Sequence, residues 1–143
     1  MRIETANAAK STILVVDDNE IVIKTISLKL QGAGYRVLAA MDGTEAVAMV
    51  RKESPDLILL DLTFPPEMIG IPWDGFRIME WFARLDAAKE IPILVITGSE
   101  DPKVRERAKQ SGAVAFFQKP LNHDELLAMI RETLAAKPRV KTA

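Results

Sequence analysis

Five residues whose side chains are suited to chemistry follow apolar runs of the sequence. Two acids, Asp17 and Asp18, come directly after the first run, and a third acid, Asp61, ends another. A hydroxyl, Thr97, and an ammonium, Lys119, end two further runs. Carboxylates held close together repel one another, by roughly 3 kcal/mol per pair at ~5 Å and an effective dielectric of ~20. A fold that gathers the three acids therefore needs a compensating positive charge.

Magnesium is the ion that suits such a cluster. It prefers oxygen ligands, keeps several waters and leaves room for a phosphate. Lys119 adds a second positive charge that can contact a phosphoryl oxygen. The set is therefore suited to transfer of a phosphoryl group onto a carboxylate oxygen, with Asp61 as the nucleophile and the metal neutralising the developing charge.

These side chains can converge only if the apolar runs form one parallel sheet. Strands are predicted over 12–16, 35–40, 56–60, 92–96 and 114–117. Helices are predicted over about 19–31, 42–53, 75–87, 99–112 and 122–136. Such alternation predicts an α/β fold, a doubly wound five-stranded parallel sheet with helices on both faces. Among such sheets, the flavodoxin-like order 2-1-3-4-5 fits a chain this short, and ligands bind at the carboxyl ends of its strands.

Several single residues have a predicted structural role. Ser99 is a candidate N-cap for the fourth helix, with Pro102 in its first turn, and Asn122 with Glu125 resembles a capping box for the last. Asp56 begins the third strand, at the end of the sheet opposite to the other acids, and we interpret it as a surface or turn residue.

Composition limits the class of protein. The 143 residues suffice for one domain, predicted over 11–136 between a flexible N-terminus (1–10) and a flexible tail (137–143). A formal net charge of −1 argues against nucleic-acid binding, and the lack of cysteine excludes disulfides. No apolar run is long enough to span a membrane and no signal segment is present, so a cytoplasmic location is expected.

The sequence resembles the receiver domains of bacterial two-component response regulators, the CheY-like family. The resemblance rests on five motifs that occur in order and near the usual spacing. Each motif is weak alone, but the five together are specific. They are VVDDNE (15–20), LILLD (57–61), DG (74–75), VITG (95–98) and FFQKP (116–120).

The resemblance implies a role for each residue of the cluster. Asp61 would be the phospho-acceptor, and Thr97 and Lys119 would contact its phosphoryl group. The implied Mg²⁺ ligands are Asp17, Asp18, Asp61 and the backbone carbonyl of Thr63.

The resemblance also implies a switch. A phosphoryl group would draw Thr97 inward and vacate space into which Phe116 turns, whereas Phe117 is interpreted as core. Thr63 and Ser99 would tune the lifetime of the phosphorylated state. The peptide bond before Pro120 is usually cis in this family.

The implied partners are a histidine kinase or a histidine phosphotransfer domain as the phosphoryl donor. A downstream protein or a second copy would bind the face formed by the fourth helix, the fifth strand and the fifth helix. The chain would be a signalling phospho-acceptor rather than an enzyme, catalysing only its own phosphorylation and dephosphorylation. We expect it to act in trans as a stand-alone receiver, or to be one domain cut from a longer protein.

Three alternatives have discriminating features. A non-phosphorylated module of the same fold would lack part of the acid set, which is complete here. A flavin-binding protein would carry a phosphate-cradling loop after the first strand, where this chain has acids. An aspartyl phosphatase would have a second acid two residues after its nucleophile, where this chain has Thr63.

The segment between Asp61 and Asp74 departs from the family, because it is about six residues longer than usual. It contains three prolines and several apolar side chains, and long loops in compact domains are often functional. Residues 64–73 could form a flap beside the acids or a rigid insert packed on the third helix. The sequence leaves both open.

Overall fold

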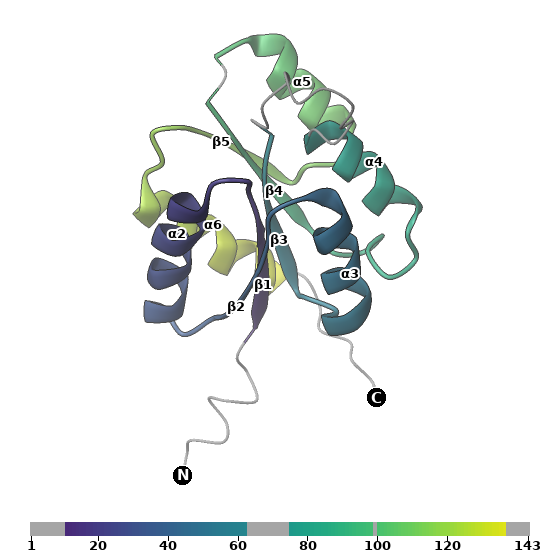
Figure 1. Cartoon of the computed structure of the whole chain (residues 1–143). Coiled ribbons are helices and arrows are strands. Elements are labelled where there is room, and N and C mark those ends of the chain that lie inside the picture. The colour runs from purple at the N-terminus through teal and green to yellow at the C-terminus, as the bar shows by residue number, and fades with distance from the viewer. Residues whose placement is uncertain (1–10, 63–74, 99, 137–143) are drawn as a thin grey trace.

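The protein is built on one parallel β-sheet. The structure, a computed structural model, describes residues 11–62, 75–98 and 100–136. Within these ranges the strands follow the order β2-β1-β3-β4-β5, which confirms the predicted topology (Figure 1). The strands are β1 (Thr12–Val16), β2 (Arg36–Ala40), β3 (Leu57–Asp61), β4 (Ile93–Thr97) and β5 (Ala115–Gln118). Thr63, Ser99, the 64–73 segment and both predicted flexible ends lie outside the described residues.

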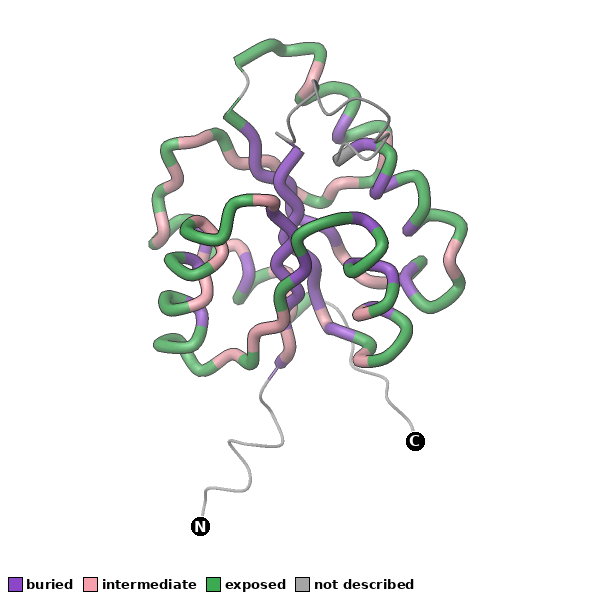
Figure 2. Tube along the Cα trace, in the orientation of Figure 1, coloured by how far each residue is buried: buried purple, intermediate pink, exposed green. Residues whose placement is uncertain are grey.

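The central strands are apolar and buried along their whole length. Every residue of β3 and of β4 is buried (Figure 2), because helices cover both faces of the sheet. The register of the central pair then fixes the position of two acids. Val16 of β1 pairs with Leu60 of β3. Asp17 and Asp61 directly follow Val16 and Leu60 in the chain, so they lie side by side.

The helices form two layers. They are α2 (Glu20–Gly32), α3 (Gly43–Glu53), α4 (Gly75–Arg84), α5 (Pro102–Gln110) and α6 (His123–Ala136). One core cluster contains buried residues of α2 and α6, and the other contains buried residues of α3, α4 and α5, so these two groups cover opposite faces of the sheet (Figure 1). None of the described helices is long and apolar enough to cross a membrane.

Local hydrogen bonds set where the helices begin. Asn19 caps α2, because its side-chain oxygen accepts from the backbone N–H groups of Ile21 (2.8 Å) and Val22 (3.2 Å). Asn122 accepts from the N–H of Glu125 at 3.0 Å, which is one half of the predicted capping box.

Two predicted helix boundaries are wrong. The N-cap of α5 is Asp101, whose side chain accepts from the N–H of Lys103 at 2.9 Å, and not Ser99. Pro102 is the first helical residue, where proline is favoured, so the cap must directly precede it. Helix α4 ends at Arg84 rather than near residue 87. Leu85 donates its N–H to the carbonyl of Phe82, a bond across three residues that closes the last turn.

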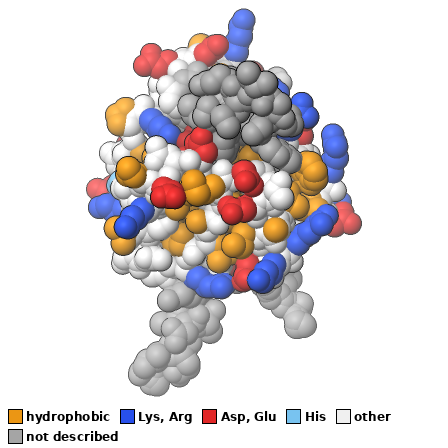
Figure 3. All heavy atoms as spheres, viewed as in Figure 1, with side chains coloured by type: hydrophobic (Ala, Val, Ile, Leu, Met, Phe, Trp, Pro, Cys, Tyr) orange, Lys and Arg blue, Asp and Glu red, His pale blue; other side chains and the backbone are white. Residues whose placement is uncertain are grey.

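Charged side chains of both signs are distributed over the surface. On the face drawn in Figure 3, acidic and basic side chains are interspersed, with hydrophobic side chains between them, and no area of one sign stands out.

Asp56 has a structural role that the sequence did not indicate. Its carboxylate accepts from the backbone N–H of Thr12 at 2.8 Å, and its own N–H donates to the carbonyl of Thr12 at 2.8 Å. Asp56 lies at the end of the sheet opposite to Asp61, as predicted, but it is half-buried and joins the beginnings of β1 and β3.

Replacing Asp56 should destabilise the protein. In an Asp56→Ala variant the N–H of Thr12 loses its acceptor, which should lower the free energy of unfolding by about 1–3 kcal/mol. Urea unfolding of the variant and the wild type measures this. Asp56→Asn keeps an acceptor oxygen and should lose less. Equal stability of the Ala variant and the wild type would contradict this role.

Candidate functional site

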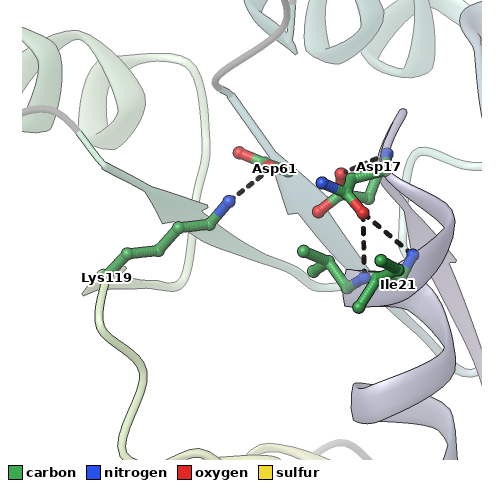
Figure 4. A network of polar contacts seen from close by, with 6 residues as sticks. Asp17, Ile21, Asp61 and Lys119 are labelled. Carbon is green, nitrogen blue, oxygen red and sulfur yellow. Dashed lines mark hydrogen bonds and ion pairs between the residues drawn. The ribbon is translucent and has the colours of Figure 1, made fainter.

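The predicted chemical residues meet at the carboxyl ends of the strands. Asp17, Asp61 and Thr97 follow or end β1, β3 and β4, and all three are buried, with 3%, 4% and 2% of their surface exposed. Asp18, beside Asp17, is half-buried. Lys119 follows β5 and extends its side chain toward Asp61 (Figure 4). The structure thus places the five residues that the sequence singled out at one edge of the sheet, but Asp17, Asp18 and Asp61 do not form the close group of three acids that was expected.

Lys119 forms an ion pair with Asp61. Its Nζ lies 2.9 Å from Oδ2 of Asp61. The backbone N–H of Lys119 donates to the carbonyl of Thr97 at 2.8 Å, so the pairing of β4 and β5 continues to this residue and fixes where its side chain starts. The bond between Lys119 and Pro120 is cis.

Asp17 is held next to Asp61 by the first turn after β1. The backbone N–H of Asn19 donates to Oδ1 of Asp17 at 2.9 Å, and the N–H of Asp17 donates to the carbonyl of Ala40 at 3.1 Å. Asn19 was not predicted to take part in the site, although it follows the acid pair directly. One residue therefore begins α2 and orients Asp17.

The site holds more negative charge than its surroundings stabilise. Burial, a hydrogen bond to Asp61 and the charge of Asp61 together raise the pKa of Asp17 to about 7, against the opposing effects of the Asn19 N–H and of Lys119. At neutral pH, the pair of Asp17 and Asp61 therefore either keeps a proton or requires another cation to balance its charge.

Lys119 stays charged in this setting. Burial lowers the pKa of its ammonium, but the hydrogen bond to Asp61 and the charges of Asp61, Asp17 and Asp18 outweigh this effect. The pKa of Lys119 lies above its usual value as a result. A permanent positive charge thus contacts Asp61 on one side, while Asp17 lies on the other.

The acid pair fits a magnesium ion. In residues 11–62, 75–98 and 100–136, no three His, Cys, Asp or Glu side chains gather closely enough to form a metal site by themselves. Magnesium does not need such a cage, because it usually takes one or two carboxylates and keeps several waters. A divalent cation beside Asp17 and Asp61 would oppose the effects of burial and of the Asp61 charge, both of which raise the pKa of Asp17.

The fifth strand places two aromatic rings on opposite faces of the sheet. Phe116 pairs with Val95, and Gln118 pairs with Thr97, so Phe116 and Thr97 share one face. Phe116 is half-buried and packs against the cluster beneath α3, α4 and α5. Phe117 is also half-buried and packs against the cluster beneath α2 and α6, which agrees with its interpretation as a core residue.

This fold with acids at its central strand ends defines a class of signalling domain, and the chain belongs to it. Residues 13–131 match the response regulator receiver domain family. The protein is therefore a receiver domain of the kind found in two-component response regulators.

Individual relatives support this assignment. The DNA-binding dual master transcriptional regulator RpaA of Synechocystis sp. is 32% identical over 131 residues, which are 92% of this chain and 52% of RpaA. The chain thus spans about half of that relative. The chemotaxis response regulator CheY4 of Vibrio cholerae is 31% identical, with a TM-score of 0.75 over 87% of this chain and 98% of CheY4.

A third similar structure contains a metal. The receiver domain of the sensor histidine kinase PA1611 of Pseudomonas aeruginosa is 26% identical, with a TM-score of 0.76 over 90% of this chain and all (100%) of that domain. That structure has a magnesium ion coordinated in its active-site cleft.

The acid pair should make the stability of the metal-free protein depend on pH. Because the folded-state pKa of Asp17, about 7, lies above its ordinary value of 3.8, the folded protein holds this proton more tightly than the unfolded chain. Stability is therefore lost as the pH rises from about 4 to about 7, by at most on the order of 4 kcal/mol.

An Asp17→Asn variant isolates this effect, because Asn keeps an acceptor for the Asn19 N–H but does not titrate. Chemical unfolding in EDTA should show the variant gaining stability relative to the wild type between about pH 5 and about pH 8. A difference in unfolding free energy that is the same at both pH values would contradict the raised pKa.

Proposed function

We propose that the protein accepts a phosphoryl group on Asp61 from a phosphohistidine donor, in a reaction that requires Mg²⁺. The observation that carries this proposal is the 2.9 Å ion pair between Lys119 and the buried carboxylate of Asp61, with Asp17 alongside. A carboxylate oxygen of Asp61 would attack phosphorus, the bond between phosphorus and the imidazole nitrogen would break, and the leaving imidazole would keep the electron pair and take up a proton.

Each residue of the site has a part in this reaction. Lys119 and the hydroxyl of Thr97 would contact oxygens of the phosphoryl group. For Lys119, this contact would replace the present one to the carboxylate of Asp61. Mg²⁺ would neutralise charge on the phosphoryl group. Its proposed ligands are Asp17, Asp18, Asp61 and the backbone carbonyl of Thr63, and the proposed modulators of phosphoryl lifetime are Thr63 and Ser99.

Phosphorylation would change the face formed by α5, β5 and α6. Thr97 would move toward the phosphoryl group, and Phe116, which shares its face of the sheet, would turn into the vacated space. A change from about 1% to about 99% of the active state requires about 5.5 kcal/mol of differential binding, to which several charge-assisted hydrogen bonds contribute. A downstream protein or a second copy would bind the altered face.

The donor would approach through a groove next to Lys119. This groove, of about 250 Å³, lies between the first turns of α2 and the segment after β5, and its lining includes Ile21, Val22, Lys119, Pro120 and Leu121. Ile21 is 74% exposed at its edge. Such an apolar surface beside the acceptor suits the helices of a histidine kinase or a histidine phosphotransfer domain.

Phosphorylation itself is tested without a protein donor. Intact-mass analysis after incubation with acetyl phosphate and Mg²⁺ should show one phosphoryl group on the wild-type protein and none on an Asp61→Asn variant. Asp56→Asn, which changes an acid at the other end of the same strand, is the matched control and should be phosphorylated. An unmodified wild-type protein that nevertheless binds Mg²⁺ would favour a non-phosphorylated protein-binding module.

Docking of the donor is tested at Ile21. An Ile21→Asp variant should accept phosphoryl groups from a phosphohistidine donor at least about tenfold more slowly, which corresponds to a loss of about 1.4 kcal/mol of donor binding. Its reaction with acetyl phosphate should be unchanged, because this small donor does not need to dock in the groove.

Leu28→Asp provides the matched control for this experiment. Leu28 is also exposed on α2 (63%), but it does not line the groove. Equal slowing of both variants with the protein donor would show that general damage to α2, and not docking in the groove, explains the loss.

A further inference from the structure

A surface arginine lies against the aromatic ring of Phe116. The guanidinium carbon Cζ of Arg105, on α5, is 4.8 Å from the centroid of the ring. This distance is within the ~6 Å range over which a cation is attracted to the face of an aromatic ring. Arg105 is exposed, whereas Phe116 is half-buried against the core. The ring therefore contacts apolar side chains beneath it and a cation at the surface.

The location of this contact connects it to Thr97. Phe116 pairs with Val95, two residues before Thr97, and the two residues point to the same face of the sheet. Helix α5 packs on that face through Val104 and Ala108, which belong to the same cluster as Phe116. Arg105 is thus on the helix that packs on the face of the sheet shared by Phe116 and Thr97.

We propose that Arg105 is a positioning residue that holds Phe116 in its half-exposed position and so sets the resting equilibrium of the switch. The proposal rests on the coupling of Thr97 and Phe116 described under the proposed function. When the ring turns inward it leaves the guanidinium, and the attraction is lost. Because Arg105 is exposed, this attraction is weak, so Arg105 shifts the equilibrium by about two- to fivefold rather than blocking it.

The same helix offers a matched control. Arg107 lies over the ring of Phe76 on α4, with its Cζ 4.0 Å from the centroid. This contact has the same chemistry and comes from the same helix, but it joins two helices and does not involve β5. Removing it takes one charge from α5 and leaves Phe116 with its arginine.

The experiment compares Arg105→Gln, Arg105→Lys and Arg107→Gln with the wild type in the full chain. The first readout is the ¹³C methyl chemical shift of Thr97 in the unphosphorylated protein, which an inward Phe116 ring changes through its ring current. The second is the apparent Kd for beryllofluoride, a phosphoryl mimic, in the presence of Mg²⁺. Linkage requires that a variant that favours the inward ring also binds the mimic more tightly.

Arg105→Gln should move the Thr97 signal toward its position in the mimic-bound protein and tighten beryllofluoride binding by about two- to fivefold. Arg105→Lys keeps a cation and should change both values less, and Arg107→Gln should change neither. If Arg105→Gln behaves like Arg107→Gln in both readouts, the proposal is overturned.

The two proposals fail in different ways. If the wild-type protein binds no beryllofluoride with Mg²⁺, phosphoryl acceptance at Asp61 is wrong. The Thr97 signal still decides the role of Arg105 in that case: a shift specific to the Arg105→Gln variant supports it, and an unchanged signal overturns it.

Discussion

The structure depends on two carboxylates buried side by side. The pairing of Val16 with Leu60 brings Asp17 and Asp61 together, and both are almost fully removed from water. An unpaired buried charge is among the most costly features that a fold can contain. Lys119 balances one of the two charges, and the pKa of Asp17 near 7 shows that the second is not fully balanced. A further cation beside the pair would relieve this imbalance, as the proposed Mg²⁺-dependent reaction requires.

The rest of the fold keeps these charges from moving apart. Strands β3 and β4 are buried along their whole length, so the backbone that carries Asp61 and Thr97 is fixed by packing on both faces. The Asn19 N–H orients Asp17, and the continued pairing of β4 with β5 fixes Lys119. Relaxation of the repulsion by local movement would break these hydrogen bonds, whereas binding of a cation would not.

Much of the fold and of this site could be predicted from the sequence, because both depend on short-range patterns. Fully buried strands are continuous apolar runs, and the residues after them are those at one edge of the sheet. Contacts between distant segments leave no such pattern. The bond from Thr12 to Asp56 joins residues that are 44 apart in sequence, and nothing near either residue indicates it. The contact between Arg105 and Phe116 could not be predicted either, because an arginine on the exposed side of a helix is common and does not indicate its neighbour. The cap of α5 was missed for a local reason, because Ser99 and Asp101 both precede Pro102 and only the position of Pro102 distinguishes them.

The centre of the sheet and its β5 edge differ in how many of their residues are buried, and this difference bears on the proposed switch. In β3 and β4 every residue is buried, whereas in β5 none of the four is. Helix α5 has one buried residue, Ala108, while α3 has four. Segments with few buried contacts open and shift at the lowest cost in free energy. A chemical change at the buried site would therefore move α5 and β5, which have few buried residues, more easily than β3 and β4. In the proposed switch, a weak contact such as that of Arg105 with Phe116 would matter at this edge because few residues beneath it are buried.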